Sequence, residues 1–264
     1  MYDKENSNGS GNNFKKEVRL KIVHISDTHG PSYCEKLVIP ECDVLIFSGD
    51  YSPWKGGLND LTQFLIWFES QPAKKKIFVA GNHDLVLDKK WGMSRTDSVS
   101  KMISLQQHQD AMILLDQYKV KYLMNTEYVF EGVKFWGSPY SPTFGHDWSF
   151  NADKGKDIQK IWAKIPSDVN VLITHTPVYG FLDTITDKYM KEGETDYHKG
   201  CKDLLEVIKK RLFNLKLHCC GHIHDDIGVV LKHVSDKRRV LFSNGAVLAN
   251  DATQLITNPL IITI

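Results

Sequence analysis

The sequence contains no uninterrupted apolar run of the roughly 18 residues that a membrane-spanning helix needs, and no excess of charge of either sign. Its 33 basic and 32 acidic residues leave a formal net charge of +1. Proteins that bind along nucleic acid rely on many contacts from Lys and Arg to phosphate. Long nucleic acid is therefore not expected as a partner, and the same balance gives no reason to expect a membrane surface. Any attraction of phosphate must be local.

Cysteine is also scarce, and its spacing is not that of a zinc finger. The number of cysteines is odd. Two of the cysteines are adjacent within an apolar run, where the geometry does not favour a disulfide. The chain has five cysteines, Cys34, Cys42, Cys201, Cys219 and Cys220. This usage predicts a reducing compartment, and we expect a cytoplasmic protein. The composition predicts no oligomeric state.

The first 16 residues differ in composition from the rest of the chain. Met1 to Lys16 is rich in Asn, Gly, Ser and Lys and has no apolar core, so it predicts a disordered tail rather than a signal peptide. Residues 17–264 are enough for one large α/β domain or for two smaller ones. We predict a single domain, because the motifs described below span most of this range.

Short β-branched stretches alternate with helical patterns along much of the chain. Strands are predicted at residues 18–25, 43–47, 76–80 and 169–173. Helical stripes are predicted around residues 61–68 and 204–212. Antiparallel hairpin material is predicted at residues 127–136, 229–243 and 260–264. We predict a two-sheet α/β sandwich, and we expect residues 84–104, which show no clear period, to form a loop over the site.

Five short runs rich in metal-binding side chains each follow a strand-like stretch. They are Asp27-Thr28-His29, Gly49-Asp50, Gly81-Asn82-His83-Asp84, Thr174-His175-Thr176 and Gly221-His222-Ile223-His224. Because loops at the carboxyl ends of parallel strands face a shared crevice, these side chains are expected to converge. Apart from His83, the runs offer two Asp, one Asn and four His, a set that suits two divalent cations sharing one bridging carboxylate.

The spacing within two of these runs favours shared ligation. Asp27 and His29 are two residues apart, so in an extended segment both side chains leave on the same side and can hold one ion. His222 and His224 repeat that spacing. Each run is a weak signal by itself. All five together, each after a strand-like stretch, predict one dinuclear metal site.

The glycine-containing runs add a bridge and a substrate contact. Gly49 has no Cβ and would let backbone and metal approach closely, and the two oxygens of Asp50 can bridge two ions. Asn82 supplies a neutral oxygen, whereas His83 is expected to point elsewhere and to remain free for the substrate. Two interpretations of Asp84 are open: it orients His83, or it caps the next turn.

The five runs resemble the calcineurin-like metallophosphoesterase superfamily, whose pattern of D-x-H, G-D, G-N-H-D/E, H and G-H-x-H they meet. Further stretches resemble its metallophosphoesterase domain-containing branch, which is similar to class III cyclic nucleotide phosphodiesterases. These stretches are Phe135–Pro142, Trp148–Asn151, Thr174–Pro177 and Thr257–Pro259. The resemblance implies a four-layer α-β-β-α sandwich of two mixed β-sheets flanked by helices.

The resemblance also implies a ligand set. One ion would be held by Asp27, His29, Asp50 and His224. The other would be held by Asp50, Asn82, His175 and His222, with Asp50 bridging. Imidazole and oxygen ligands without thiolate fit Mn, Fe, Zn or Ni, and Mn²⁺ is expected to support activity in vitro.

The chemistry that follows is phosphoric ester hydrolysis. Two such ions generate a bridging hydroxide and hold phosphate oxygens for in-line attack. Asn82 and His83 are the predicted substrate contacts, and His83 is the predicted general acid, because an imidazole can protonate a departing alkoxide. We predict a phosphodiesterase for small nucleotide-like diesters, cyclic nucleotides included. The alternatives are a phosphomonoesterase or protein phosphatase, and a non-catalytic scaffold with the same fold.

Residues outside the motifs carry weaker expectations. Six aromatic residues near the motif loops could stack on a nucleobase, although core packing is expected for most of them: Trp54, Trp91, Tyr140, Phe144, Trp148 and Tyr179. The remaining histidines are expected to be structural or at the surface: His24, His108, His146, His198, His218 and His233.

Overall fold

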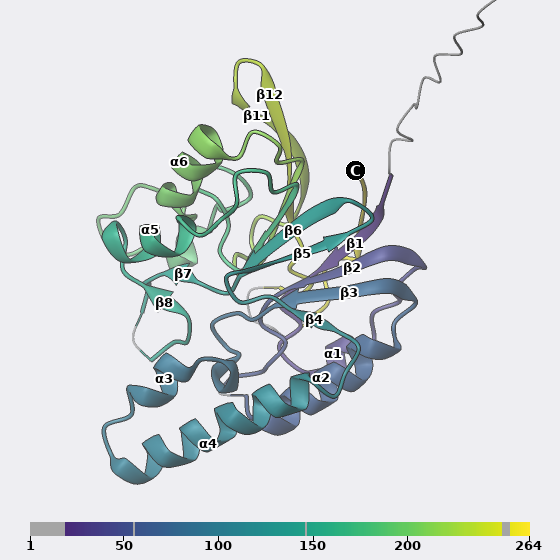
Figure 1. Ribbon diagram of the computed structural model, residues 1–264. Coiled ribbons are helices and arrows are strands. Elements are labelled where there is room, and N and C mark those ends of the chain that lie inside the picture. The colour runs from purple at the N-terminus through teal and green to yellow at the C-terminus, as the bar shows by residue number, and fades with distance from the viewer. Residues whose placement is uncertain (1–18, 55, 146, 250–253) are drawn as a thin grey trace, which may run out of the picture.

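The computed structural model describes residues 19–54, 56–145, 147–249 and 254–264, which form two large β-sheets packed face to face with helices on the outer sides (Figure 1). The predicted tail, Met1 to Lys16, lies outside the described residues, as does His146. Among the described helices, none has the length and apolar character that crossing a bilayer requires.

The first sheet has the strand order β13-β1-β2-β3-β4. Its strands are β1 (Lys21–Ile25), β2 (Cys42–Ser48), β3 (Ala73–Val79), β4 (Lys121–Tyr122) and β13 (Leu260–Thr263). Strands β1 to β4 are parallel, and the edge strand β13 runs antiparallel to β1. The carboxyl ends of β1, β2 and β3 therefore meet at one edge of the sheet.

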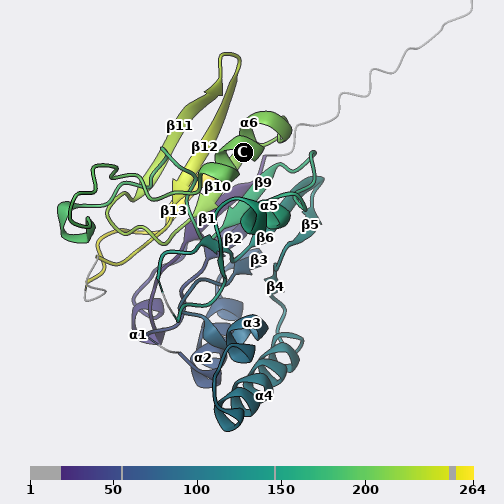
Figure 2. The same ribbon diagram turned by 90° about the vertical axis from the view of Figure 1, so that its left-hand side faces the viewer.

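The second sheet has the order β11-β12-β10-β9-β6-β5. Its strands are β5 (Thr126–Phe130), β6 (Val133–Ser138), β9 (Val171–Thr174), β10 (Leu217–Cys220), β11 (Gly228–Ser235) and β12 (Arg238–Asn244). The four inner strands are parallel, and β5 and β11 form antiparallel hairpins with their neighbours, as predicted. The β11–β12 hairpin projects beyond the rest of the molecule (Figure 2). Strands β7 (Ser141–Pro142) and β8 (Asn151–Ala152) pair separately.

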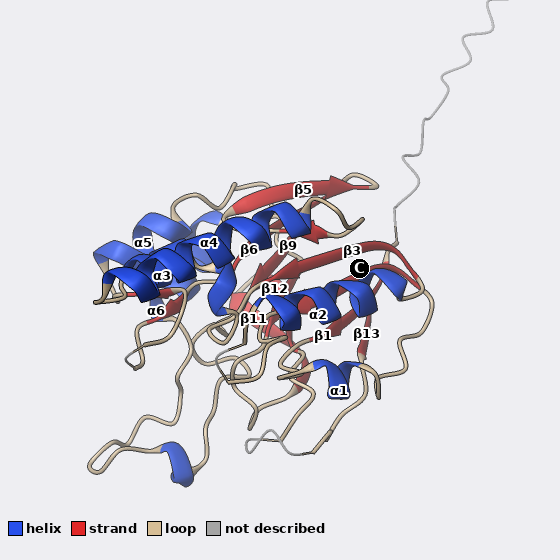
Figure 3. Cartoon of the chain, turned by 90° about the horizontal axis from the view of Figure 1, so that it is seen from below, coloured by secondary structure: helices blue, strands red, loops and turns tan. Residues whose placement is uncertain are grey.

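Helices cover the outer face of each sheet. Helices α1 (Pro31–Cys34), α2 (Leu58–Ser70) and α4 (Ser98–Leu115) pack on the first sheet (Figure 3). Helices α5 (Lys156–Trp162) and α6 (Lys202–Arg211) pack on the second. The predicted stripe of α2 is confirmed, because Leu61, Phe64, Leu65 and Phe68 are all buried.

Alternation along the strands produces three apolar layers. In β1, Ile22 faces the space between the two sheets, whereas Val23 packs toward the helices of the first sheet. In β9, Ile173 faces the same central space, whereas Leu172 packs toward α5 and α6. Because side chains on a strand point to opposite faces in turn, each sheet is apolar on both faces. Three cores separate four layers, and the predicted α-β-β-α sandwich is confirmed.

The prediction of a loop at residues 84–104 was wrong. This segment contains the 3₁₀ turn η1 (Leu85–Leu87), helix α3 (Lys89–Met93) and the start of α4. The helices begin at the side-chain caps Asp88 and Asp97, which accept hydrogen bonds from the backbone N–H groups of Lys90 and Ser100. Helix α4 leaves apolar side chains such as Met102 exposed, so its sequence lacks a clean apolar stripe.

Candidate metal centre

The five motif runs follow the carboxyl ends of five parallel strands, as predicted, and their loops are hydrogen-bonded to one another. The runs follow β1, β2, β3, β9 and β10. The backbone N–H of Asp27 donates to the carbonyl of Gly49 at 2.9 Å, and the N–H of Gly221 donates to the carbonyl of His175 at 3.0 Å. These bonds join loops of different strands and fix the positions of the side chains they carry.

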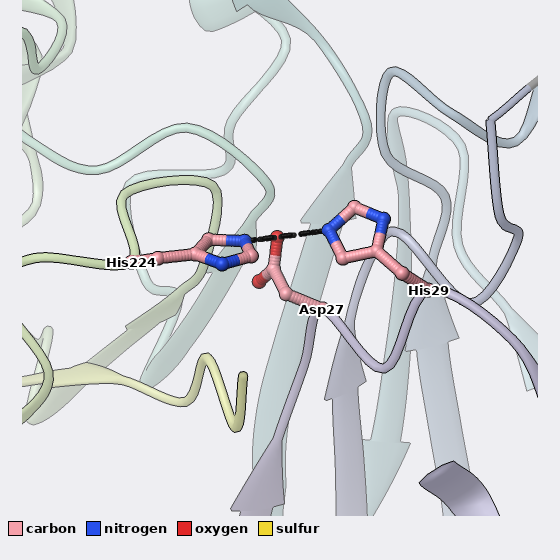
Figure 4. Close-up of side chains that lie close together, drawn as sticks. All are labelled: Asp27, His29 and His224. Atoms are coloured by element: carbon pink, nitrogen blue, oxygen red, sulfur yellow. Dashed lines mark hydrogen bonds and ion pairs between the residues drawn. The ribbon is translucent and has the colours of Figure 1, made fainter. Parts of the chain in front are cut away.

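Asp27, His29 and His224 form the first group of converging donors (Figure 4). The Nε2 atom of His224 lies 3.3 Å from Oδ1 of Asp27, and Nε2 of His29 lies 4.0 Å from the same oxygen. The two Nε2 atoms are 3.3 Å apart. Three donor atoms from two sheets thus face one point.

Asp50, His175 and His222 form the second group, in which one donor atom from each residue lies within 4.8 Å of the others. Nε2 of His175 is 3.3 Å from Oδ2 of Asp50. The side-chain oxygen of Asn82 is 2.9 Å from the same nitrogen. The amide oxygen therefore lies beside this group.

Asp50 also joins a third group, with His29 and His83, and so links the two sets of donors. The backbone N–H of His83 donates to Oδ1 of Asp50 at 2.8 Å, and its ring nitrogen Nε2 lies 4.0 Å from Oδ2. The His83 ring centroid is 4.5 Å from that of His29. The expectation that His83 points elsewhere was wrong: its ring faces the same centre.

The backbone of the donor loops is left-handed at four positions. Asp27, His29, Asp50 and His222 have φ values of 54°, 46°, 60° and 70°. The reason given above for convergence, an extended segment, was therefore wrong, although the side chains do converge. A residue other than glycine in this region costs on the order of 1–3 kcal/mol, and such strain is concentrated at functional sites.

Two motif glycines leave space for donor side chains. A Cβ added to Gly49 would lie 2.4 Å from Nδ1 of His175, and one added to Gly81 would lie 2.2 Å from Oδ1 of Asp50. Such distances are far inside van der Waals contact. Gly49 was expected to let a metal ion approach, and the structure adds that its missing Cβ makes room for the imidazole of His175.

Burial and charge act in opposite directions on the donors. Burial would raise the pKa of Asp27, but the hydrogen bond and charge of His224 lower it to about 2. Burial would likewise raise the pKa of Asp50, yet the imidazoles of His175 and His83 hold it well below its ordinary range. Both aspartates are thus carboxylates at neutral pH. Burial lowers the pKa of His175, but the charge of Asp50 outweighs it and raises that pKa to about 9.

The donor set fits a pair of divalent cations. Nδ1 of His175 lies 2.9 Å from the carbonyl oxygen of Ser48, and Nδ1 of His224 lies 3.2 Å from that of Ala249. A carbonyl only accepts, so each Nδ1 carries a hydrogen. Without metal, the raised pKa of His175 leaves a proton on its Nε2 as well, facing the Asp50 carboxylate, and a cation bound there would take the place of that proton. Facing acceptors need a positive charge between them. Imidazole, carboxylate and amide oxygen together suit Mn, Fe, Zn or Ni.

Asp84 connects two donor loops. Its buried carboxylate accepts hydrogen bonds from the backbone N–H groups of Asp50 at 2.9 Å, Ser52 at 3.0 Å and Gly81 at 2.7 Å. It makes no side-chain cap to the turn η1 that follows it. Neither interpretation offered above is correct, because Asp84 ties the loop after β2 to the loop after β3.

Replacing Asp84 with alanine should destabilise the protein by about 3 kcal/mol, since several buried N–H groups would lose their acceptor. Because the loops carry Asp50 and Asn82, affinity for Mn²⁺ should fall about 10- to 100-fold. Denaturant unfolding and calorimetric titration measure the two effects. Asp97→Ala, which removes a single helix cap, is the control and should cost about 1 kcal/mol. If both variants lost the same stability and the same Mn²⁺ affinity, the role of Asp84 in tying the two donor loops together would be contradicted.

A cavity of about 990 Å³ opens beside the donors, and His29, His83, His222 and His224 line it. Four of the six aromatic residues named above also line it: Trp54, Phe144, Trp148 and Tyr179. For these four the expectation of core packing was wrong. The ring centroid of Tyr140 instead lies 5.7 Å from that of Phe150. The ring centroid of Trp91 lies 4.0 Å from Cζ of the Arg95 guanidinium.

Asn244, at the end of β12, is a supporting residue that the sequence did not reveal. Its side-chain amide donates to the carbonyl oxygens of Leu182 at 3.2 Å, Ile223 at 2.7 Å and Asp226 at 3.0 Å. It thereby holds the loop that carries His222 and His224. The only signal was its place at the end of a parallel strand, because no motif includes it.

The histidines outside the motifs differ in environment. His24 is buried and hydrogen-bonded to Ser243 at 2.7 Å and Ser48 at 2.8 Å, so its predicted structural role is confirmed. His198 is not simply structural: it lines the cavity, and its Nδ1 lies 2.6 Å from the buried carboxylate of Asp183. The pairing could not be read from the sequence, because the two residues are far apart in the loop between β9 and α6.

Comparison with known proteins identifies the family. The family model of the calcineurin-like phosphoesterases matches residues 20–226. The chain belongs to this family. The match spans all five motif runs, and the resemblance drawn from them is confirmed.

Two kinds of relative support this membership. Metallophosphoesterase domain-containing protein 1 of Homo sapiens is 34% identical over 217 residues, covering 80% of this chain and 62% of that protein. A UPF0046 protein of Caenorhabditis elegans is 31% identical over 242 residues, covering 92% of this chain and 74% of that protein. This member of the calcineurin-like phosphoesterase family therefore spans less than two thirds of its human relative.

A solved structure shares the fold at low identity. The phosphopantetheinyl hydrolase of Mycobacterium tuberculosis superimposes with a TM-score of 0.54 at 14% identity, covering 92% of this chain and 95% of that chain. The likeness confirms the architecture.

Proposed function

We propose that this member of the calcineurin-like phosphoesterase family is a phosphoric ester hydrolase that cleaves phosphodiesters with two divalent metal ions. The observation that carries the proposal is the convergence of donors from five loops on Asp50. Its carboxylate belongs to the group with His175 and to the group with His29 and His83, and His29 in turn belongs to the group with Asp27. A carboxylate placed between two donor sets is what a bridging ligand requires.

The first ion would be held by Asp27, His29, Asp50 and His224, and the second by Asp50, Asn82, His175 and His222. When bound, such ions supply an activated water and neutralise the phosphate oxygens. The hydrogen bonds from His175 to Ser48 and from His224 to Ala249 orient both rings with Nε2 toward the centre. The protein thus supports both sites from outside the donor set.

His83 and Asn82 are the residues proposed to act on the substrate. The Nδ1 atom of His83 is buried without a hydrogen-bond partner among the described residues, and its Nε2 edge faces Asp50. From this position the ring can donate a proton to the oxygen that leaves phosphorus. The hydroxyl of Ser149 donates to the backbone carbonyl of Asn82 at 2.9 Å and holds its loop in place.

The cavity lining supports a diester rather than a monoester. A monoester carries up to two negative charges and favours arginine, but among the described residues that line the cavity there is no arginine. Four lysines line it, Lys154, Lys191, Lys199 and Lys202. The Nζ atom of Lys199 lies 2.5 Å from the carboxylate of Glu194, and that of Lys202 lies 3.5 Å from the carboxylate of Asp196. A diester carries one charge that two cations can neutralise. The assignment to small nucleotide-like diesters, cyclic nucleotides included, comes from the resemblance to the phosphodiesterase branch.

Removing divalent metal with a chelator should abolish hydrolysis, and Mn²⁺ should restore it. Because the metal binds the folded chain, Mn²⁺ at about 100 times its dissociation constant should stabilise the protein by about 2.7 kcal/mol. Rates should be measured with a nitrophenyl monoester, a linear diester and a cyclic nucleotide, and the melting temperature with and without Mn²⁺.

Three results of this assay would contradict the proposed function. Preference for the monoester would overturn the diester assignment in favour of a phosphatase. A melting temperature that rises with Mn²⁺ while every ester stays intact would favour a scaffold. Full activity in the presence of the chelator would contradict the metal centre itself.

We also propose a cytoplasmic location. The five cysteines are all free and buried, which supports a reducing compartment. A small phosphodiester is the proposed partner, and the balanced charge supports neither long nucleic acid nor a membrane surface.

A further inference from the structure

Three aromatic side chains form one wall of the cavity. We call Trp54, Phe144 and Trp148 the aromatic wall. The ring centroids of Trp54 and Trp148 are 4.6 Å apart at an interplanar angle of 79°, and those of Phe144 and Trp148 are 6.0 Å apart at 28°. The three rings come from two loops, after β2 and after β7, and together they make a continuous apolar surface.

Two residues of the aromatic wall are exposed. Trp54 is 66% exposed and Phe144 is 44% exposed, whereas Trp136 and Trp162 in the core are 2% and 0% exposed. Large aromatic rings that are exposed within a concave surface are typical of a ligand site. The cavity they line holds about 990 Å³, a volume that suits a small ligand.

The wall touches the proposed catalytic group. The ring centroid of His83 is 4.6 Å from that of Trp148 and 5.8 Å from that of Trp54. At the other end, Phe144 lies 4.8 Å from His222. A general acid must lie within hydrogen-bond reach of the leaving oxygen, so the group bonded to that oxygen begins beside His83 and next to these rings.

We propose that the aromatic wall is a specificity subsite that receives a planar aromatic ring carried on the leaving-group side of a phosphodiester. This inference rests on the proposed function and narrows it. In the hydrolysis, water adds to phosphorus and loses one proton to solvent, the bond from phosphorus to the leaving oxygen breaks, and that oxygen takes a proton from His83, which regains one from solvent. The products are a phosphomonoester and an alcohol or phenol. The planar ring stacks against the aromatic wall throughout, because each face of an aromatic ring is a stacking surface.

The test compares leaving groups of similar acidity, one aromatic and one aliphatic, as in the phenyl and hexafluoroisopropyl esters of methyl phosphate. In Trp54→Ala, the ratio of kcat/KM for the phenyl ester to that for the hexafluoroisopropyl ester should fall about 5- to 150-fold, the range for loss of one stacked ring. Most of the loss should be in KM. Trp54→Phe should keep most of the ratio, and Phe144→Ala should lower it as well.

Phe213→Ala is the matched control. Phe213 is 67% exposed, close to the value for Trp54, and does not line the cavity. Its removal should leave the ratio unchanged. An unchanged ratio in both Trp54→Ala and Phe144→Ala would overturn the subsite while leaving the hydrolase intact.

A binding measurement separates this inference from the proposed function. The monomethyl esters of phenylphosphonate and methylphosphonate differ only in that one carries a phenyl ring where the other carries a methyl group. The ring is bonded to phosphorus through carbon and is not a leaving group. Calorimetry with the Mn²⁺-loaded protein therefore measures binding at the subsite alone. The phenyl compound should bind about tenfold or more tightly, and Trp54→Ala should remove that difference. If no ester is cleaved but this preference persists, the hydrolase proposal fails and the subsite stands. Equal affinities in the wild-type protein overturn the subsite.

Discussion

Asp50→Ala and Asn82→Ala should each abolish metal-dependent hydrolysis of a nitrophenyl phosphodiester while the protein remains folded. Asp50 belongs to two of the three donor groups, and Asn82 contributes the amide oxygen beside His175. Loss of either donor should lower kcat/KM at least about 1,000-fold, which corresponds to about 4 kcal/mol of transition-state stabilisation. Circular dichroism and thermal unfolding establish whether the fold is retained.

A control for Asp50 lies on the same strand. Asp43 stands near the start of β2, where its carboxylate pairs with the exposed ammonium of Lys74 at 2.6 Å, whereas Asp50 follows the end of that strand. A surface ion pair contributes at most about 1 kcal/mol, so Asp43→Ala should keep full activity. Asp50→Asn is a second test, because its amide oxygen can still accept from His83 but the charge is gone. Full activity of Asp50→Ala or Asn82→Ala would remove the proposed metal centre.

His83→Ala should cost more with poor leaving groups than with good ones. A nitrophenolate leaves without protonation, whereas an alkoxide needs a proton as its bond to phosphorus breaks. We expect a loss of about 100- to 10,000-fold on alkyl esters and a distinctly smaller one on the nitrophenyl ester. The dependence of log kcat on the pKa of the leaving group measures this difference, and its slope should become steeper in the variant.

The control for this experiment is His233→Ala, since His233 lies exposed on β11 and away from the cavity lining. It should leave both the rates and the slope unchanged. A uniform loss across all leaving groups in His83→Ala would assign His83 to holding the phosphate instead of donating a proton. That result would also weaken the argument for the aromatic wall, because the wall was placed on the leaving-group side through its contact with His83.

The strand ends were predictable because two independent patterns coincide there. Each motif begins where a β-branched apolar stretch stops, so the sequence alone places donors such as Asp27 and His175 at carboxyl ends of strands. The helices at residues 89–115 were missed, because their starts depend on the caps Asp88 and Asp97 and not on an apolar period. Caps are single residues, and single Asp residues are common in loops as well.

The sequence by itself determined the identity of the donors, their order along the chain and the class of metal they suit, because these depend on residue type and on the periods of strands and helices. Only the tertiary structure decided how the donors meet. Left-handed backbone at Asp27 and Asp50, and the three N–H groups gathered by Asp84, arise from contacts between loops far apart in the chain. The tertiary structure also decided which side chains are exposed. Trp54 and Trp136 are the same residue type, but packing buries Trp136 in the core and leaves Trp54 exposed at the cavity.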